Sequence, residues 1–236
     1  MTRAREAPPR RRVSRAAALG ATAILVLALG AVVAFPDLRR RAPEAIREVA
    51  RDLWSIVGVR RVEGHASEIR AAAAESGIDP CLLAAVMYTE SRGQVDAVSP
   101  RGALGAFQLM PSAAGDAAAK LGLRAPTREE LLSDSLLGAR LAAVHLAWLI
   151  RHEGPDAERV LVAYNAGRTK LKRWVDAEGG YEAWRRSRLE AGGAGTLAYA
   201  RGVLAMRDRF RERGEIAPAL EPLGGAAGDW TTGLAD

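Results

Sequence analysis

Apolar residues recur at helical spacing throughout the central part of this chain, and strand-like alternation of apolar and polar residues is scarce. Helix start signals agree with this pattern. Asp79 before Pro80 is typical of an N-cap and first helical residue, and Thr127 with Glu130 is typical of a capping box. The predicted helices lie over 68–76, from 79 onward, and over 134–152, 155–166 and 197–211. We expect an all-α, single compact domain, with any β structure limited to a short hairpin near residues 99–109.

An uncharged apolar segment of twenty residues runs from Ala16 to Phe35. At 1.5 Å per residue, a helix of this length spans about 30 Å, the thickness of the hydrocarbon core of a bilayer. The arginines before it are typical of the cytoplasmic side. A signal peptide cleaved near Ala34 and an uncleaved membrane anchor both fit, and the length favours the anchor because the apolar region of signal peptides is usually shorter. In either case we expect the later residues to lie outside the cytoplasmic membrane, in the cell envelope.

The positive charge of the chain lies mostly in this N-terminal part. Residues 1–35 hold six arginines and one glutamate, whereas the other 201 residues hold 28 basic and 27 acidic side chains. The remainder of the chain is therefore almost neutral and lacks the basic excess of a nucleic-acid-binding surface. We expect no nucleic-acid partner, and we predict contact with a membrane through residues 16–35.

These patterns divide the chain into segments of different character. The predicted segments are a basic N-terminal region at 1–15, a transmembrane anchor or signal peptide at 16–35, a juxtamembrane stalk at 36–62, a catalytic domain at 63–213 and a disordered tail at 214–236. The tail is assigned from its Pro, Gly and small residues, which show no periodicity.

Metal and redox chemistry find little support in the residue counts. The single cysteine, Cys81, excludes a disulfide within the chain and a zinc site built from several cysteines. The three histidines, His65, His145 and His152, lack the spacing of a zinc-binding HExxH motif. Cys81 fits a small buried apolar residue better than a nucleophile. We expect no cofactor.

Glu90 is the best candidate for a catalytic residue. Leu83, Val86 and Met87 occupy one helix face at i, i+3 and i+4, and Glu90 follows on that face at i+7. It also falls in the last turn of its helix, where the helix dipole disfavours a negative charge. Burial and the dipole both predict a raised pKa, which suits a general acid for glycosidic cleavage. An ion pair with a buried arginine is the alternative that position alone leaves open.

Four motifs occur in an order that resembles one enzyme family. They are Glu90-Ser91, the segment Gly102–Pro111 (GALGAFQLMP), the segment Ala163–Gly167 (AYNAG), and Tyr199 before Arg201–Leu204 (RGVL). Together they resemble the soluble lytic transglycosylases, whose catalytic domain is similar to goose-type lysozyme. The resemblance covers roughly residues 69–209 and implies a lysozyme-like α fold with a groove for the glycan strands of peptidoglycan. Phe107 departs from the family pattern, in which methionine is common.

The resemblance also implies roles for single residues. Glu90 would be catalytic, and Tyr199 would bring its hydroxyl to the Glu90 carboxylate. The implied substrate-binding residues are Ser91, Gln108, Met110, Tyr164, Asn165 and Tyr199. Their side chains suit this role, since amides and hydroxyls bond to sugar hydroxyl and N-acetyl groups and a methionine forms an adaptable apolar wall.

The implied reaction uses one carboxylate twice. Glu90 would protonate the oxygen between N-acetylmuramic acid and N-acetylglucosamine, and would then accept the proton of the muramic acid C6 hydroxyl as this attacks C1. The product is a 1,6-anhydromuramic acid end. A hydrolytic muramidase is one alternative, and it would usually need a second carboxylate within about 5–10 Å. Asp96 and Asp116 are candidates for that second acid. The other alternative is a catalytically idle peptidoglycan-binding scaffold.

Overall fold

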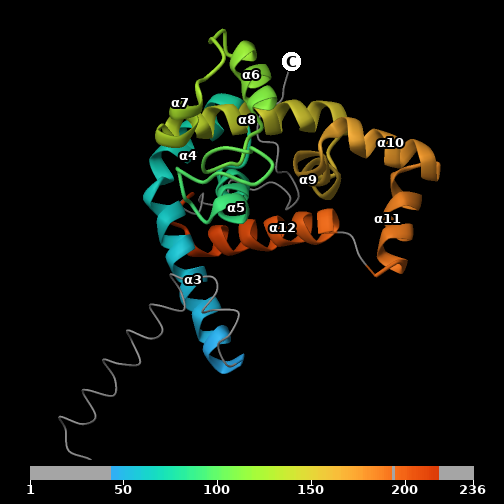
Figure 1. The fold of residues 1–236 in the computed structure, drawn as a ribbon, viewed down its shortest axis with the longest axis horizontal. Helices are drawn as coiled ribbons and strands as arrows, with labels where there is room; N and C mark the ends of the chain where they lie inside the picture. The colour runs from blue at the N-terminus through green and yellow to red at the C-terminus, as the bar shows by residue number, and fades with distance from the viewer. Residues whose placement is uncertain (1–43, 193–194, 218–236) are drawn as a thin grey trace, which may run out of the picture. The chain divides into compact units, whose positions relative to one another are not determined.

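The computed structural model describes residues 44–192 and 195–217, and these residues are largely helical (Figure 1). Their helices are α3 (Glu44–Gly64), α4 (Ala66–Ser76), α5 (Pro80–Ser91), α6 (Pro111–Lys120), α7 (Arg128–Ser133), α8 (Ser135–Glu153), α9 (Ala157–Ala166), α10 (Arg168–Glu178), α11 (Tyr181–Glu190) and α12 (Gly195–Arg213). The only β pairing in the described residues is two isolated bridges, Val98 with Leu104 and Leu104 with Leu109. The expectation of an all-α fold is thus confirmed, and the β bridges lie where a hairpin was predicted.

The predicted start signals open helices in the structure. The Asp79 carboxylate accepts a hydrogen bond from the Cys81 backbone N–H at 2.8 Å, with Pro80 as the first residue of α5. Thr127 and Glu130 form both bonds of a capping box at the start of α7. These caps satisfy backbone N–H groups that have no partner inside the helix.

The chain divides into two compact units, residues Met1–Ile56 and Val57–Asp236, and the division falls within α3. The first unit is described only over the part of α3 that begins at Glu44. The second unit contains the remaining helices and the hydrophobic core.

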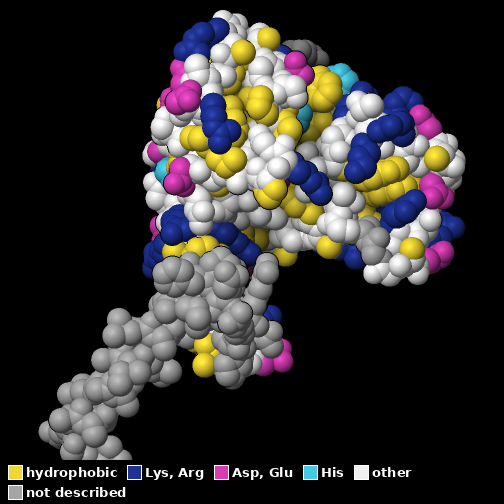
Figure 2. Space-filling model, viewed as in Figure 1, with side chains coloured by type: hydrophobic (Ala, Val, Ile, Leu, Met, Phe, Trp, Pro, Cys, Tyr) yellow, Lys and Arg dark blue, Asp and Glu magenta, His cyan; other side chains and the backbone are white. Residues whose placement is uncertain are grey.

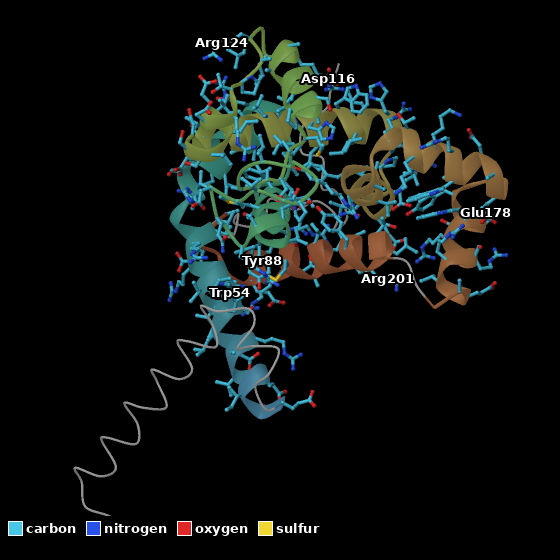
Figure 3. All side chains as sticks on the ribbon, viewed as in Figure 1. Trp54, Tyr88, Asp116, Arg124, Glu178 and Arg201 are labelled. Carbon is cyan, nitrogen blue, oxygen red and sulfur yellow. The ribbon has the colours of Figure 1, made fainter. Side chains whose placement is uncertain are left out.

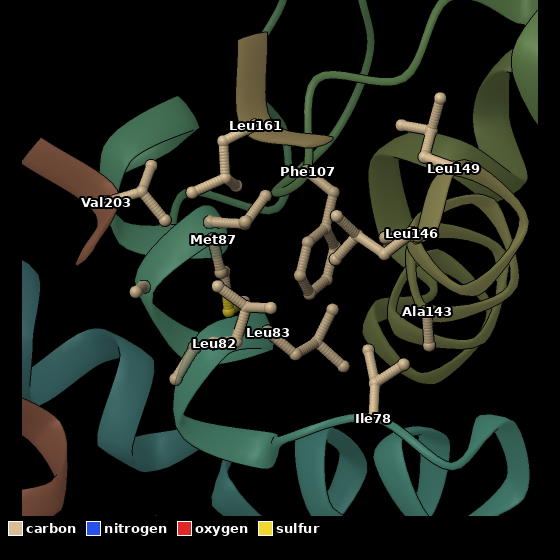
Figure 4. Packing of buried hydrophobic residues seen from close by; sticks show 14 of the residues in the cluster. Ile78, Leu82, Leu83, Met87, Phe107, Ala143, Leu146, Leu149, Leu161 and Val203 are labelled. Atoms are coloured by element: carbon tan, nitrogen blue, oxygen red, sulfur yellow. The ribbon is translucent and has the colours of Figure 1, made fainter. Parts of the chain in front are cut away.

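Helix α5 forms the centre of this core. It packs against α4 and α12 and also contacts α8, and every residue from Cys81 to Tyr88 is buried. Figure 4 shows its side chains meeting others from the loops before α5 and α6 and from α8, α9 and α12: Ile78, Leu82, Leu83, Met87, Phe107, Leu146, Leu149, Leu161 and Val203. Because burying one large apolar side chain contributes roughly 1.5–3 kcal/mol, the position of α5 is strongly determined.

Helices α10 and α11 form a hairpin that the hydrophobic pattern does not indicate. The rings of Trp174 and Trp184 stack between them, with centroids 5.6 Å apart and planes 8° from parallel. An ion pair between Arg188 and Glu178, at 3.1 Å, joins the same two helices. Glu178 lies at the end of α10 (Figure 3).

The predictions for the two ends of the chain have different outcomes. The apolar segment 16–35, predicted to be an anchor or signal peptide, lies outside the described residues. Within the described part of the chain, none of the helices has the length and apolar character needed to cross a membrane. At the other end, the predicted disorder does not hold for residues 214–217. Ile216 is fully buried there, and the Arg70 guanidinium donates to the Glu215 and Ile216 carbonyls at 3.2 and 3.3 Å.

Candidate active site

Glu90 lies in the last turn of α5, where the helix is about to end. Arg92 ends the helix with a left-handed backbone conformation, φ 58°, and its N–H bonds to the Tyr88 carbonyl at 2.9 Å. The buried residues of α5 and its cap at Asp79 fix the helix along its length. The carboxyl group of Glu90 is therefore presented from a rigid support.

Tyr199 of α12 supplies the hydrogen bond to this carboxyl group. Its hydroxyl donates to Glu90 Oε1 at 2.7 Å, across 109 residues of sequence. Burial raises the pKa of Glu90 from 4.5 to about 7, and the bond from Tyr199 partly opposes this shift. Burial and the nearby Glu90 raise the pKa of Tyr199 well above 10, so its hydroxyl keeps its proton. Glu90 can thus hold or release a proton near neutral pH.

No second carboxylate takes part in this arrangement among the described residues. The pKa of Glu90 is shifted by burial and by the hydrogen bond from Tyr199, and no carboxylate contributes to the shift. Asp96 is exposed in the loop after α5, and Asp116 is exposed on α6 (Figure 3). Asp116 acts instead on His145, because its charge raises the pKa of that imidazole.

A tight loop between α5 and α6 lies beside Glu90. Leu104 and Leu109 exchange both backbone hydrogen bonds at 3.0 Å, and the Gly105 N–H bonds to the Ala97 carbonyl at 2.8 Å. Gly105 has φ +75° and packs so closely that an added Cβ would lie 2.2 Å from the Leu131 carbonyl oxygen. Only glycine fits this position without moving the backbone.

Three of the predicted substrate-binding side chains hold the backbone of this loop. The Ser91 hydroxyl donates to the Ala106 carbonyl at 2.7 Å, and the Tyr164 hydroxyl donates to the Phe107 carbonyl at 3.0 Å. The amide nitrogen of Gln108 donates to the Gly105 and Ala97 carbonyls at 2.9 and 3.1 Å. The structure therefore brings these residues together with Glu90 and gives each of them a partner within the protein.

The other two predicted residues present free surface. Met110 is 44% exposed and precedes the first residue of α6. Asn165 is exposed near the end of α9 and lines a pocket of about 390 Å³. Side chains of α10 and α11 form much of that pocket. No motif in the sequence indicates this pocket. The concentration of tryptophan, lysine and arginine in residues 168–188 is the one sequence feature that could have pointed to it.

The cysteine and histidine side chains form no metal site in the described residues. No group of three His, Cys, Asp or Glu side chains there could hold an ion. Cys81 is buried, and burial raises the pKa of its thiol to about 11. His145 and His152 both contact Trp148 on α8, and burial lowers the pKa of His145 to about 4.

Comparisons with known proteins find similarity to one family. The model of the transglycosylase SLT domain family matches residues 67–187, just over half of the chain. No curated protein matches.

Three solved structures share the fold at 22% identity. An inactive glutamate-to-glutamine mutant of the lytic transglycosylase Slt from Pseudomonas aeruginosa has a TM-score of 0.55, over 66% of this chain and 25% of that one. The 70 kDa soluble lytic transglycosylase of Escherichia coli has a TM-score of 0.53, over 62% and 24%. A complex of the 70 kDa enzyme with bulgecin A has a TM-score of 0.61, over 77% and 29%. The chain thus spans about a quarter of the length of the proteins it resembles.

Proposed function

Because the chain belongs to the transglycosylase SLT domain family, we propose that it is a peptidoglycan lytic transglycosylase with Glu90 as its catalytic acid and base. The observation that carries this proposal is the buried carboxyl group of Glu90, which has a pKa of about 7 and a hydrogen bond from Tyr199. A general acid works best when its pKa lies near the working pH.

The first step of the proposed reaction is proton donation. Neutral Glu90 donates its proton to the oxygen that links N-acetylmuramic acid to N-acetylglucosamine, and the bond from C1 to that oxygen breaks. The carboxylate left behind is stabilised by the Tyr199 hydroxyl, which donates to it. The 2-acetamido group of the muramic acid stabilises the positive charge that develops at C1, as in substrate-assisted glycosidases.

The second step returns the proton to Glu90. The carboxylate accepts the proton of the C6 hydroxyl of the same sugar, and the C6 oxygen bonds to C1 to give the 1,6-anhydro ring. This route needs no carboxylate to activate water. Asp96 and Asp116, the two candidates for a second acid, are both exposed.

The surrounding side chains divide into two proposed roles. Ser91, Gln108 and Tyr164 act as positioning residues, because their hydrogen bonds hold the loop beside Glu90. Met110 and Asn165 have exposed side chains and contact the sugars directly. Gln108 also keeps its amide oxygen for the substrate.

The names of the similar structures agree with this proposal. All three structures are of lytic transglycosylases, and one of them is an inactive mutant in which glutamine replaces a glutamate. We further propose that the domain works in the cell envelope. The apolar segment 16–35 would anchor it to the cytoplasmic membrane, with secretion after cleavage near Ala34 as the alternative.

The test is to digest purified sacculi with the full chain in water labelled with ¹⁸O and to identify the released muropeptides by mass spectrometry. We expect anhydro ends without label, and a loss of about 100- to 10,000-fold in rate for Glu90→Gln, as for removal of a general acid. Labelled reducing ends would instead establish a hydrolytic muramidase. Binding of sacculi without release of fragments would establish a scaffold.

A further inference from the structure

The C-terminal part of α3, residues 57–64, lies against the end of the helix that carries Glu90. Gly58 is buried there, and a Cβ added to it would lie 3.0 Å from a ring carbon of Tyr88 and 3.1 Å from the Cβ of Arg92. Protein interiors leave little room for such an addition. A side chain at position 58 would therefore have to displace Tyr88 or Arg92.

Gly93 makes a second close approach from the other side of this contact. It follows α5 with φ +74°, and a Cβ added to it would lie 2.9 Å from the Arg61 Cβ and 3.0 Å from the Val62 backbone nitrogen. Val59 and Val62 of α3 are themselves buried in the core. One glycine in each segment thus allows α3 and the turn after α5 to lie in direct contact.

Ion pairs hold this part of α3 in place. The Glu63 side chain is only 8% exposed, and it pairs with Arg213 of α12 at 2.5 Å and with Arg60 at 3.5 Å. Figure 2 shows Lys and Arg side chains gathered over the surface where α3 meets α12. The end of α3 is therefore fixed to α12, the helix that carries Tyr199.

The turn after α5 connects this contact to Glu90. Arg92 has φ 58°, a left-handed conformation that is unfavourable for a residue with a Cβ. Its N–H bonds to the Tyr88 carbonyl at 2.9 Å, and its guanidinium lies 4.2 Å from the centre of the Tyr88 ring. The same ring meets Phe210 of α12 edge-on, with centroids 6.2 Å apart. Because Glu90 lies between Tyr88 and Arg92 in the chain, a shift of either residue also moves Glu90.

We propose that Gly58 is a positioning residue. Because it has no side chain, α3 can approach the turn after α5 and keep Glu90 at hydrogen-bonding distance from Tyr199. This inference rests on the proposed function for the reaction that Glu90 performs. The family model matches residues 67–187, so residues 57–64 lie outside the part of the chain that it covers. The active site thus depends on a helix that precedes the matched domain.

The first experiment measures cleavage of soluble peptidoglycan strands by full chains that carry Gly58→Ala or Gly64→Ala. Gly64 is the matched control, because it belongs to the same helix and a Cβ added there would meet nothing within 4 Å. We expect Gly58→Ala to lower kcat by about 10- to 100-fold and to change KM by less than about 2-fold, since a misplaced acid slows the chemical step more than binding. Gly64→Ala should cleave as fast as the unchanged protein. Equal rates in the two variants would overturn the proposal.

The pH–rate profile distinguishes positioning from a general loss of folded protein. The titratable groups that the charge of Glu90 affects are Tyr199 and Tyr164, and the bond from Tyr199 lowers the pKa of the Glu90 carboxyl group. If Gly58→Ala moves Glu90 away from that hydroxyl, this pKa rises and the alkaline limb moves to higher pH. In the Tyr199→Phe background, Gly58→Ala should move the limb no further. A lower rate with an unmoved limb would overturn the proposal, because Gly58 would then serve stability alone.

Two further variants keep the test decisive if Gly58→Ala folds poorly. Arg92→Gly removes the Arg92 atoms nearest to the added methyl group, and glycine adopts φ 58° without strain. Combined with Gly58→Ala, it should restore kcat several-fold and return the limb toward its original pH. Gly93→Ala disturbs the contact from the other side and should slow cleavage more than Gly122→Ala, which has a similar φ of +69° but lies in open space. Equal rates for Gly93→Ala and Gly122→Ala would contradict the proposal.

The last experiment does not depend on catalysis. The pKa of Glu90 is measured by NMR in full-length protein that contains ¹³C-labelled glutamate, and Glu90→Gln identifies its signal. We expect about 7 in the unchanged protein and a higher value in Gly58→Ala, with the same circular dichroism in both. A raised value, together with no cleavage of any strand by the unchanged protein, would refute the proposed function and leave the positioning role standing. Cleavage to anhydro products, with the same pKa in both proteins, would do the reverse.

Discussion

The end of α5 and the hairpin of α10 and α11 are built in different ways. In α5 every residue from Cys81 to Tyr88 is buried, and the catalytic candidate Glu90 lies two residues after Tyr88. In α10 only Leu171 is buried, and in α11 only Tyr181 and Trp184. The first region lies within the core of the domain, whereas the second adds only these three buried side chains to that core and is otherwise held by a ring stack and by ion pairs.

This difference distinguishes a rigid support for a reacting group from a more variable element near the surface. A general acid must be held within a fraction of an ångström, and a helix inside the core provides that precision. An element with few buried side chains can vary without disturbing the reacting groups. The hairpin can therefore change its sequence at low cost in stability, whereas α5 cannot.

The strongest test of the contrast is a pair of leucine truncations. Leu83 of α5 is fully buried and Leu189 of α11 is 40% exposed. Leu83→Ala should lower the free energy of unfolding by about 3–4 kcal/mol, because it leaves a cavity in the core, whereas Leu189→Ala should change it by less than about 0.5 kcal/mol. Urea denaturation followed by circular dichroism measures both. Similar losses in the two variants would show that the hairpin is as well packed as α5.

Two glycines of the loop beside Glu90 give a second matched pair. Both have positive φ, but an added Cβ at Gly105 would meet the Leu131 carbonyl oxygen at 2.2 Å, whereas at Gly102 it would meet nothing within 4 Å. Gly105→Ala should therefore destabilise the protein by about 3 kcal/mol and slow cleavage, and Gly102→Ala by only about 1 kcal/mol. Thermal denaturation and cleavage rates test this. Equal effects would mean that the loop is not packed against Leu131 in solution.

Replacing Glu90 should make the protein more stable, in a way that depends on pH. Its pKa is raised from 4.5 to about 7 in the folded state, so the folded protein binds this proton more tightly than the unfolded chain. The loss of stability caused by ionising the buried Glu90 carboxyl group is absent below pH 4.5, grows as the pH rises, and is complete above pH 7. Glu90→Gln should therefore raise the free energy of unfolding by about 2 kcal/mol at pH 8 and change it by almost nothing at pH 4.

In the hairpin, Glu178→Gln should instead lower the free energy of unfolding by up to about 1 kcal/mol, because Glu178 forms an ion pair with Arg188. Denaturation of both variants at several pH values measures the contrast. A stability gain for Glu90→Gln that is the same at pH 4 and pH 8 would rule out the raised pKa.

Two tyrosine hydroxyls provide the smallest contrast. Tyr199 donates to Glu90, and this bond lowers the pKa of the carboxyl group, so Tyr199→Phe should move the alkaline limb of the pH–rate profile to higher pH and lower kcat by about 10-fold. The Tyr181 hydroxyl in α11 is buried with no partner among the described residues. Tyr181→Phe should therefore leave the cleavage rate unchanged and shift the free energy of unfolding by less than about 0.5 kcal/mol. Activity measured from pH 4 to pH 9 distinguishes them. An unmoved limb in Tyr199→Phe would remove this tyrosine from the site.

Local signals were enough to predict most of the helices. The caps at Asp79 and Thr127 involve residues two or three positions apart, so the sequence shows both partners together. The inward position of Glu90 follows from helical spacing, and the direction of its pKa shift follows from burial. The hairpin of α10 and α11 gave no such pattern, because so few of its residues are buried.

The partners within the site could not be predicted from residue types. The sequence shows that Ser91, Gln108 and Tyr164 can form hydrogen bonds, but the groups they bond to depend on how distant segments pack. Tyr164 bonds to a carbonyl 57 residues away. Only the resemblance to a known family predicted that Tyr199 would reach Glu90, because the two residues lie 109 positions apart.

The hydrogen bonds of Ser91, Gln108 and Tyr164 have a consequence for the evolution of this site. All of them end on backbone carbonyls, which are the same whichever side chains the loop carries. Side chains of the loop other than Gly105 can therefore change without loss of these bonds, provided that each new residue fills the same volume in the core. Phe107 shows this division: its ring is buried among core side chains, while its carbonyl accepts the bond from Tyr164 (Figure 4).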